Sequence, residues 1–117
     1  MFRAILIGLL LLALVRVEDE RQEYLRVTFY TLHGMMADGN SVHRDAAACS
    51  QWIPFGTQLM FDDGYVVTCE DRGHGDWYWK GWVDVWAPSW QWGQDNIHSA
   101  YGDYAWVTVV RWGWDGE

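Results

Sequence analysis

Cys69–Trp86 has the sequence CEDRGHGDWYWKGWVDVW, and this stretch decides most of what can be expected of the fold. Valine alternates with larger side chains at its end, which predicts a β-strand with Asp84 between Trp82 and Trp86 on one face. A second strand is expected to run into Asp71, and a Gly- and Trp-rich loop separates the two. Two carboxylates on either side of an aromatic loop indicate a site that handles sugars.

Alternation and turn residues extend this pattern to the rest of the chain. Further strands are predicted at residues 25–30, 57–61, 65–69 and 104–112. Asp63-Gly64 predicts a hairpin with a type I′ turn between the middle two. Pro88-Ser89 can start a short helix that Gly102 ends, and residues 31–48 have the composition of a loop. We therefore predict a mainly β protein, built as a barrel.

Composition limits the class of partner. The chain has 117 residues, enough for one domain, with ten Trp and a net charge of −8. An acidic chain disfavours nucleic-acid binding, which needs Lys and Arg to neutralise phosphates. A neutral polymer, or one with cationic groups, fits better, although the acidity can also simply keep a Trp-rich protein soluble. Ten Trp exceed what a small core needs, so we expect some of them to line a surface groove.

The N-terminal segment predicts export. Residues 1–17 combine a basic start with a 12-residue apolar run, Ala4 to Val15, which is short for a membrane span and typical of a signal peptide. The alternative is an uncleaved N-terminal anchor, and this segment is the one expected contact with a membrane. Residues 18–26 are predicted to be a charged linker and residues 27–114 the folded domain. We expect a secreted or extracytoplasmic protein.

Cys49 and Cys69 are the two cysteines of the chain. In an exported protein an even count favours a disulfide, with free buried thiols as the alternative. Neither residue lies in a CxxC or HxxxH pattern, so no metal site is predicted. No sequence pattern indicates a cofactor.

Six short motifs occur in an order that carries a family resemblance. They are Thr28-Phe29-Tyr30, Ala37-Asp38-Gly39, Ile53-Pro54-Phe55-Gly56-Thr57, Asp71-Arg72-Gly73, Lys80-Gly81 and the strand around Asp84. With the final AWVTVV strand, they resemble the three-aspartate (3D) domain family of double-psi β-barrels. That family is similar to the catalytic domain of membrane-bound lytic transglycosylase A, to rare-lipoprotein-A-like domains and, more distantly, to expansins.

The resemblance implies a six-stranded double-psi β-barrel with one or two short helices. It implies that Asp71 is the catalytic aspartate and Asp84 the supporting one. The chain departs from the family pattern at Cys49, where the family has its first aspartate, and at Arg72, which replaces a threonine. The family's association with cell walls implies a polysaccharide partner, with peptidoglycan the expected one.

Cleavage of a glycosidic bond needs a carboxylic acid that protonates the leaving oxygen. Burial against tryptophan and a neighbouring carboxylate would both raise the pKa of Asp71, whereas Arg72 would keep it ionised by pairing with it. The alternatives are structural. Asp71 can cap a turn at Gly73, and Asp84 can make a hydrogen bond across the barrel.

Side chains around the two carboxylates are candidates for holding a sugar. Flat indole rings stack on pyranose faces, so we expect substrate contacts from a group that also includes a histidine and a lysine: Trp77, Trp79, Trp82, Lys80 and His74. A place in the core or in a protein interface is the alternative for the Trp residues. A solvated loop position is the alternative for His74.

Three functions fit these features. The first is a cell-wall glycan-cleaving enzyme, most closely a peptidoglycan lytic transglycosylase. The second is a non-catalytic glycan-binding module comparable to expansins, and the third is an interaction domain that uses a Trp-rich surface on another protein. We expect a monomer in each case.

Overall fold

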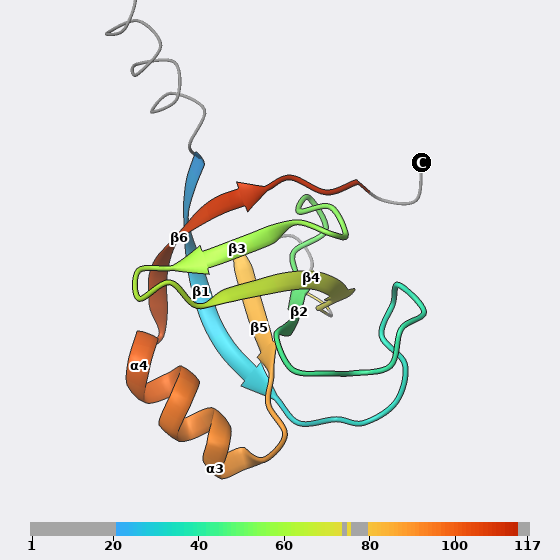
Figure 1. The fold of residues 1–117 in the computed structure, drawn as a ribbon, viewed down its shortest axis with the longest axis vertical. Coiled ribbons are helices and arrows are strands. Elements are labelled where there is room, and N and C mark those ends of the chain that lie inside the picture. The colour runs from blue at the N-terminus through green and yellow to red at the C-terminus, as the bar shows by residue number, and fades with distance from the viewer. Residues whose placement is uncertain (1–20, 74, 76–79, 115–117) are drawn as a thin grey trace, which may run out of the picture.

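Six strands close into a barrel in the computed structural model, which describes residues 21–73, 75 and 80–114 (Figure 1). In chain order the strands are β1 (Arg21–Tyr30), β2 (Ala46–Cys49), β3 (Gln58–Phe61), β4 (Val66–Arg72), β5 (Trp82–Trp86) and β6 (Tyr104–Arg111). Around the barrel their order is β1-β5-β2-β4-β3-β6. The pairs β1·β5 and β2·β4 are parallel and the others antiparallel. The closed, mainly β barrel confirms the predicted fold class.

β1 begins earlier than the alternation pattern indicated. Its first half, from Arg21 to Arg26, pairs with β6, and its second half pairs with β5. The charged stretch that precedes residue 27 is thus part of the barrel from Arg21 onward. Its polar side chains are compatible with a strand because one side of the strand faces solvent.

β2 was missed from the sequence, where residues 31–48 were expected to form a loop. Its sequence is Ala-Ala-Ala-Cys, and alanine has low β propensity. All four residues are buried, and the strand pairs with β4 on one side and β5 on the other. Pairing with β4 and β5 therefore makes these residues a strand. Their small side chains leave space above β2 on the outer face of the barrel.

The hairpin between β3 and β4 is confirmed, but its turn is not the type I′ turn that Asp63-Gly64 predicted. The Gly64 N–H donates to the Phe61 carbonyl at 2.9 Å, and the Phe61 N–H donates to the Tyr65 carbonyl at 2.8 Å. Gly64 has a φ of +90°, whereas Asp63 is not among the residues with positive φ. This is a type I turn followed by a glycine bulge, which a three-residue loop favours.

Among the described residues, one helical segment is present, and it lies at one end of the barrel (Figure 1). It consists of α3 (Trp90–Gly93), the π-turn η1 (Gln94–His98) and α4 (Ser99–Tyr101). The Ser89 hydroxyl accepts the Trp92 N–H at the start, and Gly102 follows the end with a φ of +70°, as predicted. Within the described part of the chain, no helix is long and apolar enough to cross a membrane.

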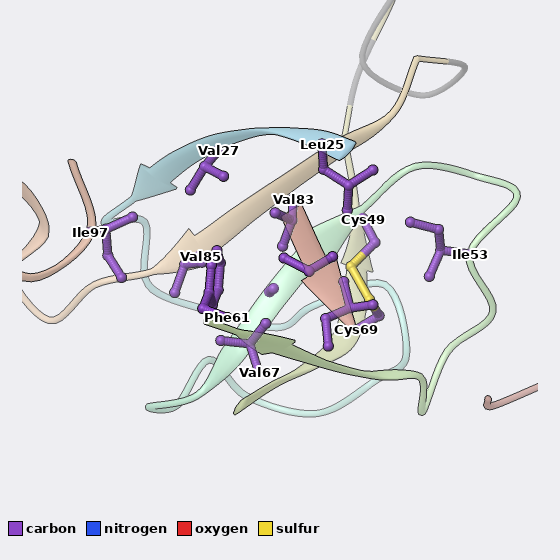
Figure 2. Packing of buried hydrophobic residues seen from close by; sticks show 13 residues of the cluster. Leu25, Val27, Cys49, Ile53, Phe61, Val67, Cys69, Val83, Val85 and Ile97 are labelled. Atoms are coloured by element: carbon purple, nitrogen blue, oxygen red, sulfur yellow. A yellow bond between two sulfur atoms is a disulfide. The ribbon is translucent and has the colours of Figure 1, made fainter. Parts of the chain in front are cut away.

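The core fills the barrel with apolar side chains from every strand and from the helix, and the disulfide is part of it (Figure 2). Cys49 and Cys69 are bonded, with their Cα atoms 5.7 Å apart. This confirms the predicted disulfide. The bond ties β2 to its parallel neighbour β4 and closes a loop of 20 residues, which contributes about 3 kcal/mol to stability. The predicted signal peptide or anchor, residues 1–17, lies outside the described residues.

Candidate functional site

Four side chains form a row across the outer face of the barrel. Thr28 on β1 pairs with Asp84 on β5, Asp84 pairs with Ala48 on β2, and Ala48 pairs with Asp71 on β4. Residues directly opposite each other on paired strands point to the same face of a sheet. The two carboxylates are thus two strands apart, about 10 Å between Cα atoms at the usual strand spacing. Only the small side chain of Ala48 stands between them.

A β-bulge in β4 puts Asp71 into this row. Ala47 pairs with Cys69, but the next residue, Ala48, pairs with Asp71, so Glu70 is an extra residue in β4. Cys69 points into the core. Without the bulge, strict alternation would point Asp71 into the core as well. The bulge re-aims the carboxylate to the face that carries Asp84.

Both carboxylates line one cavity of about 480 Å³, together with Tyr30, Leu32, Ala48, Arg72 and Gly73. A second cavity of about 620 Å³ shares five of these seven residues and continues along the loop after β1, past His33, Met35, Met36, Ala37 and Val42. We call the two cavities together the groove. Among the described residues its lining is formed by Tyr30, His33, Arg72, small and aliphatic residues and the two carboxylates, and Trp82 is not part of it.

Asp84 is largely buried where β5 pairs with β1. It is 9% exposed, and its Oδ1 accepts the Thr28 hydroxyl at 2.7 Å. Thr28 Oγ1 in turn accepts the indole N–H of Trp82 at 2.7 Å, so the hydroxyl proton is directed to Asp84. Burial raises the pKa of Asp84 to about 6, the Thr28 hydrogen bond opposes the rise, and the charge of Asp71 adds to it. Asp84 therefore holds a proton at mildly acidic pH.

Asp71 lies in a different, more polar environment. Its Oδ1 accepts the backbone N–H groups of Ala37 at 3.0 Å and Arg72 at 2.9 Å, and the Tyr30 hydroxyl lies 3.4 Å from Oδ2. Burial, together with the charges of Asp71 and Asp84, raises the pKa of Tyr30 above its ordinary value. Tyr30 thus keeps its proton and presents an O–H donor to the groove.

Arg72, which the sequence suggested as an ion-pair partner of Asp71, is placed differently. Its guanidinium lies 4.0 Å from the centroid of the Phe55 ring. Its contact with Asp71 is through the backbone N–H.

No family model, curated protein or solved structure matches this chain. The chemistry of the groove therefore has to follow from its own residues. A buried carboxyl with a raised pKa beside a second, hydrogen-bonded carboxylate is an arrangement that can supply one proton and accept another. In the described part of the chain, no group of three or more His, Cys, Asp or Glu side chains is arranged to hold a metal ion.

The predicted sugar-binding residues are distributed unevenly. Trp82 is 8% exposed, its ring lies against the Arg26 guanidinium, and its indole N–H donates to Thr28, so it positions the Thr28 hydroxyl for Asp84. Lys80 is exposed, and its carbonyl accepts the Ser50 hydroxyl. Trp77, Trp79 and His74 lie outside the described residues.

Thr28 and Tyr30 are site residues that the sequence gave only as part of a motif, with no role in the site. Both lie on β1, two residues apart, where Thr28 pairs with Asp84 and Tyr30 pairs with Trp86. The signal was present, because strict alternation places Thr28 and Tyr30 on one face of their strand. What the sequence lacked was the register between β1 and β5, which brings that face to Asp84.

Proposed function

We propose that this protein is an extracytoplasmic enzyme that cleaves glycosidic bonds, most closely a peptidoglycan lytic transglycosylase. The observation that carries the proposal is the row of Asp84, Ala48 and Asp71 over one groove, with the two carboxyls in different environments. In an acid–base pair, the two titratable groups lie in environments that push their pKa values apart. The resemblance to three-aspartate domains, whose six motifs include both aspartates, implies the same reaction. It gives the acid role to Asp71 and a supporting role to Asp84, whereas the raised pKa of Asp84 favours Asp84 as the acid.

The two carboxyls divide the proton transfers. Asp84, with its raised pKa, gives its proton to the leaving glycosidic oxygen as the bond from that oxygen to C1 breaks. The 6-hydroxyl of the same sugar attacks C1, and Asp71 accepts the hydroxyl proton as the new C1–O6 bond forms. The product is an anhydro sugar, no water is consumed, and return of the proton from Asp71 to Asp84 resets the site.

Neighbouring groups fit these roles. Tyr30 stays protonated and can donate to a sugar oxygen beside Asp71. Ala48 has no side chain beyond Cβ, so a sugar ring has space between the carboxylates. The disulfide between Cys49 and Cys69 is typical of oxidising compartments, which supports a place outside the cytoplasm.

The test is release of soluble fragments from purified peptidoglycan, analysed by mass. We expect fragments with anhydro ends from the wild-type protein and a loss of about 10²–10⁴-fold with Asp71→Asn. The matched control is Asp95→Asn, the same chemical change at an exposed helix position outside the lining of the groove. Absence of fragments from the folded, disulfide-bonded wild type would exclude this activity, and fragments without anhydro ends would indicate hydrolysis instead.

A second candidate is a non-catalytic glycan-binding module, and one surface favours it. Tyr24 on β1 stacks on Tyr104 at 5.6 Å and packs against Trp106 at 5.2 Å, both on β6. All three rings are about half exposed. We call these three residues the aromatic wall. Exposed aromatic faces suit the C–H faces of sugar rings, and they also suit a protein partner, the third function considered.

Retention on insoluble cell-wall material separates this candidate from the enzyme. A binding module predicts retention that survives Asp71→Asn and weakens with Trp106→Ala. Retention lost with Asp71→Asn and unchanged by Trp106→Ala would contradict it. Binding to a protein with no affinity for glycan would favour the interaction domain.

A further inference from the structure

One wall of the groove is a small hairpin that connects β1 to β2. Val42 N–H donates to the Gly34 carbonyl at 2.9 Å, Met36 N–H donates to the Asn40 carbonyl at 2.7 Å, and Met35 forms a bridge with Ser41. We call residues 34–42 the wall hairpin. Four of its side chains line the groove: Met35, Met36, Ala37 and Val42.

Glu70, the bulge residue, is the anchor of this hairpin on β4. It is 8% exposed. Its carbonyl accepts the Asp38 N–H at 3.1 Å, its Oε1 accepts the Asn40 side-chain amide at 3.1 Å, and its Oε2 lies 2.6 Å from His43 Nε2. A buried carboxylate needs such partners, because leaving it unpaired is costly. Both of its oxygens are thus bound from the hairpin and the residue that follows it.

The His43 ring has an acceptor at each nitrogen. Nδ1 lies 2.7 Å from the Arg44 carbonyl, and Nε2 faces the Glu70 carboxylate. A neutral imidazole carries one N–H, and an ionised carboxylate only accepts. Both hydrogen bonds therefore require one extra proton on the pair, either on the imidazole or on the carboxyl. When that proton leaves, the neutral imidazole keeps one N–H, which points either to Glu70 at 2.6 Å or to the Arg44 carbonyl at 2.7 Å, and the other contact becomes repulsive because it has lost its hydrogen.

The contact between His43 and Glu70 is connected to Asp71 through neighbouring residues of the backbone. Ala37, whose N–H donates to Asp71 Oδ1, is the residue before Asp38, whose N–H donates to the Glu70 carbonyl. Glu70 is also the residue before Asp71 and the bulge that aims it. The docking of the wall hairpin and the orientation of Asp71 therefore share their support.

We propose that His43 and Glu70 form a proton-dependent latch that docks the wall hairpin on β4 and so positions Asp71. The pair closes the groove wall while it holds its extra proton, and the wall hairpin loosens when rising pH removes it. His43 and Glu70 are positioning residues, since they act through Ala37 and Asp71. The consequence for catalysis rests on the proposed function, but the latch itself is a property of the free protein.

The surroundings of His43 support this behaviour. Glu70 faces it from β4, and Asp38 faces it from the wall hairpin. The Arg44 side chain turns to the Trp92 ring, with its guanidinium 5.1 Å from the ring centroid. Partial burial lowers the pKa of His43, but the Arg44 carbonyl and Glu70 outweigh it, so that the net shift is upward. The side chain is 50% exposed, so it can exchange its proton with solvent.

The experiment follows two signals by NMR in the full chain with its disulfide intact, from about pH 5 to pH 9, across the range in which histidine titrates. One signal is the His43 ring and the other is the Ala37 backbone amide, and no glycan is present. We expect the His43 midpoint to lie above the ordinary histidine value. We expect the Ala37 amide to shift with the same midpoint, and its exchange with solvent to lose protection above it.

Two variants separate the latch from a merely structural contact. H43Q supplies an amide N–H to Glu70 at every pH, so Ala37 should stay protected and stop responding above neutral pH. E70Q supplies an amide N–H to neutral His43, so the His43 midpoint should fall while the wall hairpin stays docked. Controls are H98Q, a histidine change on the helix, and D84N, which removes the titration of Asp84 from the groove. Both should leave the shared midpoint unchanged.

Several results would overturn the proposal. They are an Ala37 amide that does not follow His43, a His43 midpoint that E70Q leaves unchanged, and a midpoint that D84N abolishes. Because no substrate is used, the latch can hold in a protein that cleaves no glycan, and it can fail in one that does.

Discussion

The groove and the aromatic wall lie on the same barrel, but they use aromatic residues in opposite ways. At the groove, Trp82 and Trp86 are buried, and their indole N–H groups donate to Thr28 and to the Leu32 carbonyl. On the aromatic wall, Tyr24 and Trp106 leave about half of their surface to solvent. The difference shows that a tryptophan close to a carboxylate in sequence can be a buried structural residue. The exposed rings that could contact a ligand come from strands that lie far from that carboxylate in sequence.

The largest expected effect tests whether the groove and not the aromatic wall carries the chemistry. Asp84→Asn should lower glycan release about 10²–10⁴-fold, because the amide cannot supply a proton. Trp106→Ala should leave the rate on soluble glycan fragments unchanged. In the wild type the rate should fall as pH rises above about 6, where Asp84 loses its proton. Equal losses in both variants would remove the distinction between the two regions.

The disulfide should matter more to the groove than to the aromatic wall. Replacing both Cys49 and Cys69 by alanine should lower the free energy of unfolding by about 3 kcal/mol, measured with denaturant. Hydrogen exchange should show the loss first in β2 and β4, which the bond joins, and later in β6. Equal loss of protection in all three strands would contradict a local role for the bond.

Asp84 should make the stability of the protein depend on pH. Its pKa is raised from 3.8 to about 6, so the folded state binds the proton more tightly than the unfolded state. The resulting stability is fully present below about pH 4 and is lost as pH rises to about 6. Two pKa units correspond to about 3 kcal/mol as an upper value. Denaturation across this range should show the loss in the wild type and a much smaller loss in Asp84→Asn, whereas Asp95→Asn should behave as the wild type does.

The aromatic wall should give the smallest effect on stability. Tyr24→Ala removes two ring contacts at an exposed position, for which about 1 kcal/mol is expected. Thermal unfolding measures the change, and Tyr24→Phe, which keeps the ring, is the matched control. A change of several kcal/mol would show that this surface belongs to the framework and is not an available binding face.

Local chemistry made several elements predictable. The hairpin followed from Asp62, Asp63 and Gly64, and the helix followed from Ser89 at its start and Gly102 after its end. In each case the determining contacts lie within a few residues in sequence. The exact turn type was wrong, because the loop length favours a type I turn with a glycine bulge over the type I′ turn.

Long-range pairing made other elements unpredictable. Nothing in Ala46–Ala48 favours a strand, and β2 exists because β4 and β5 lie on either side of it. No sequence pattern predicts the shift in register between Ala47 and Ala48, yet this shift moves the Asp71 side chain from the inner to the outer face of the barrel. The aromatic wall depends on the register of β1 against β6, so composition alone predicted exposed aromatics but not their place.

The sequence by itself determined that the chain is a β-rich domain with two aspartates, Asp71 and Asp84, that flank an aromatic loop, and its two cysteines favoured the disulfide that the structure confirms. Side-chain alternation, turn residues and cysteine count are local or compositional properties, so they can be recognised without a partner strand. The tertiary structure alone decided that a bulge at Glu70 brings Asp71 into line with Asp84 over Ala48, and that Trp82 and Trp86 on the strand of Asp84 are buried. Those outcomes depend on strand register and burial, which arise only when distant segments pair.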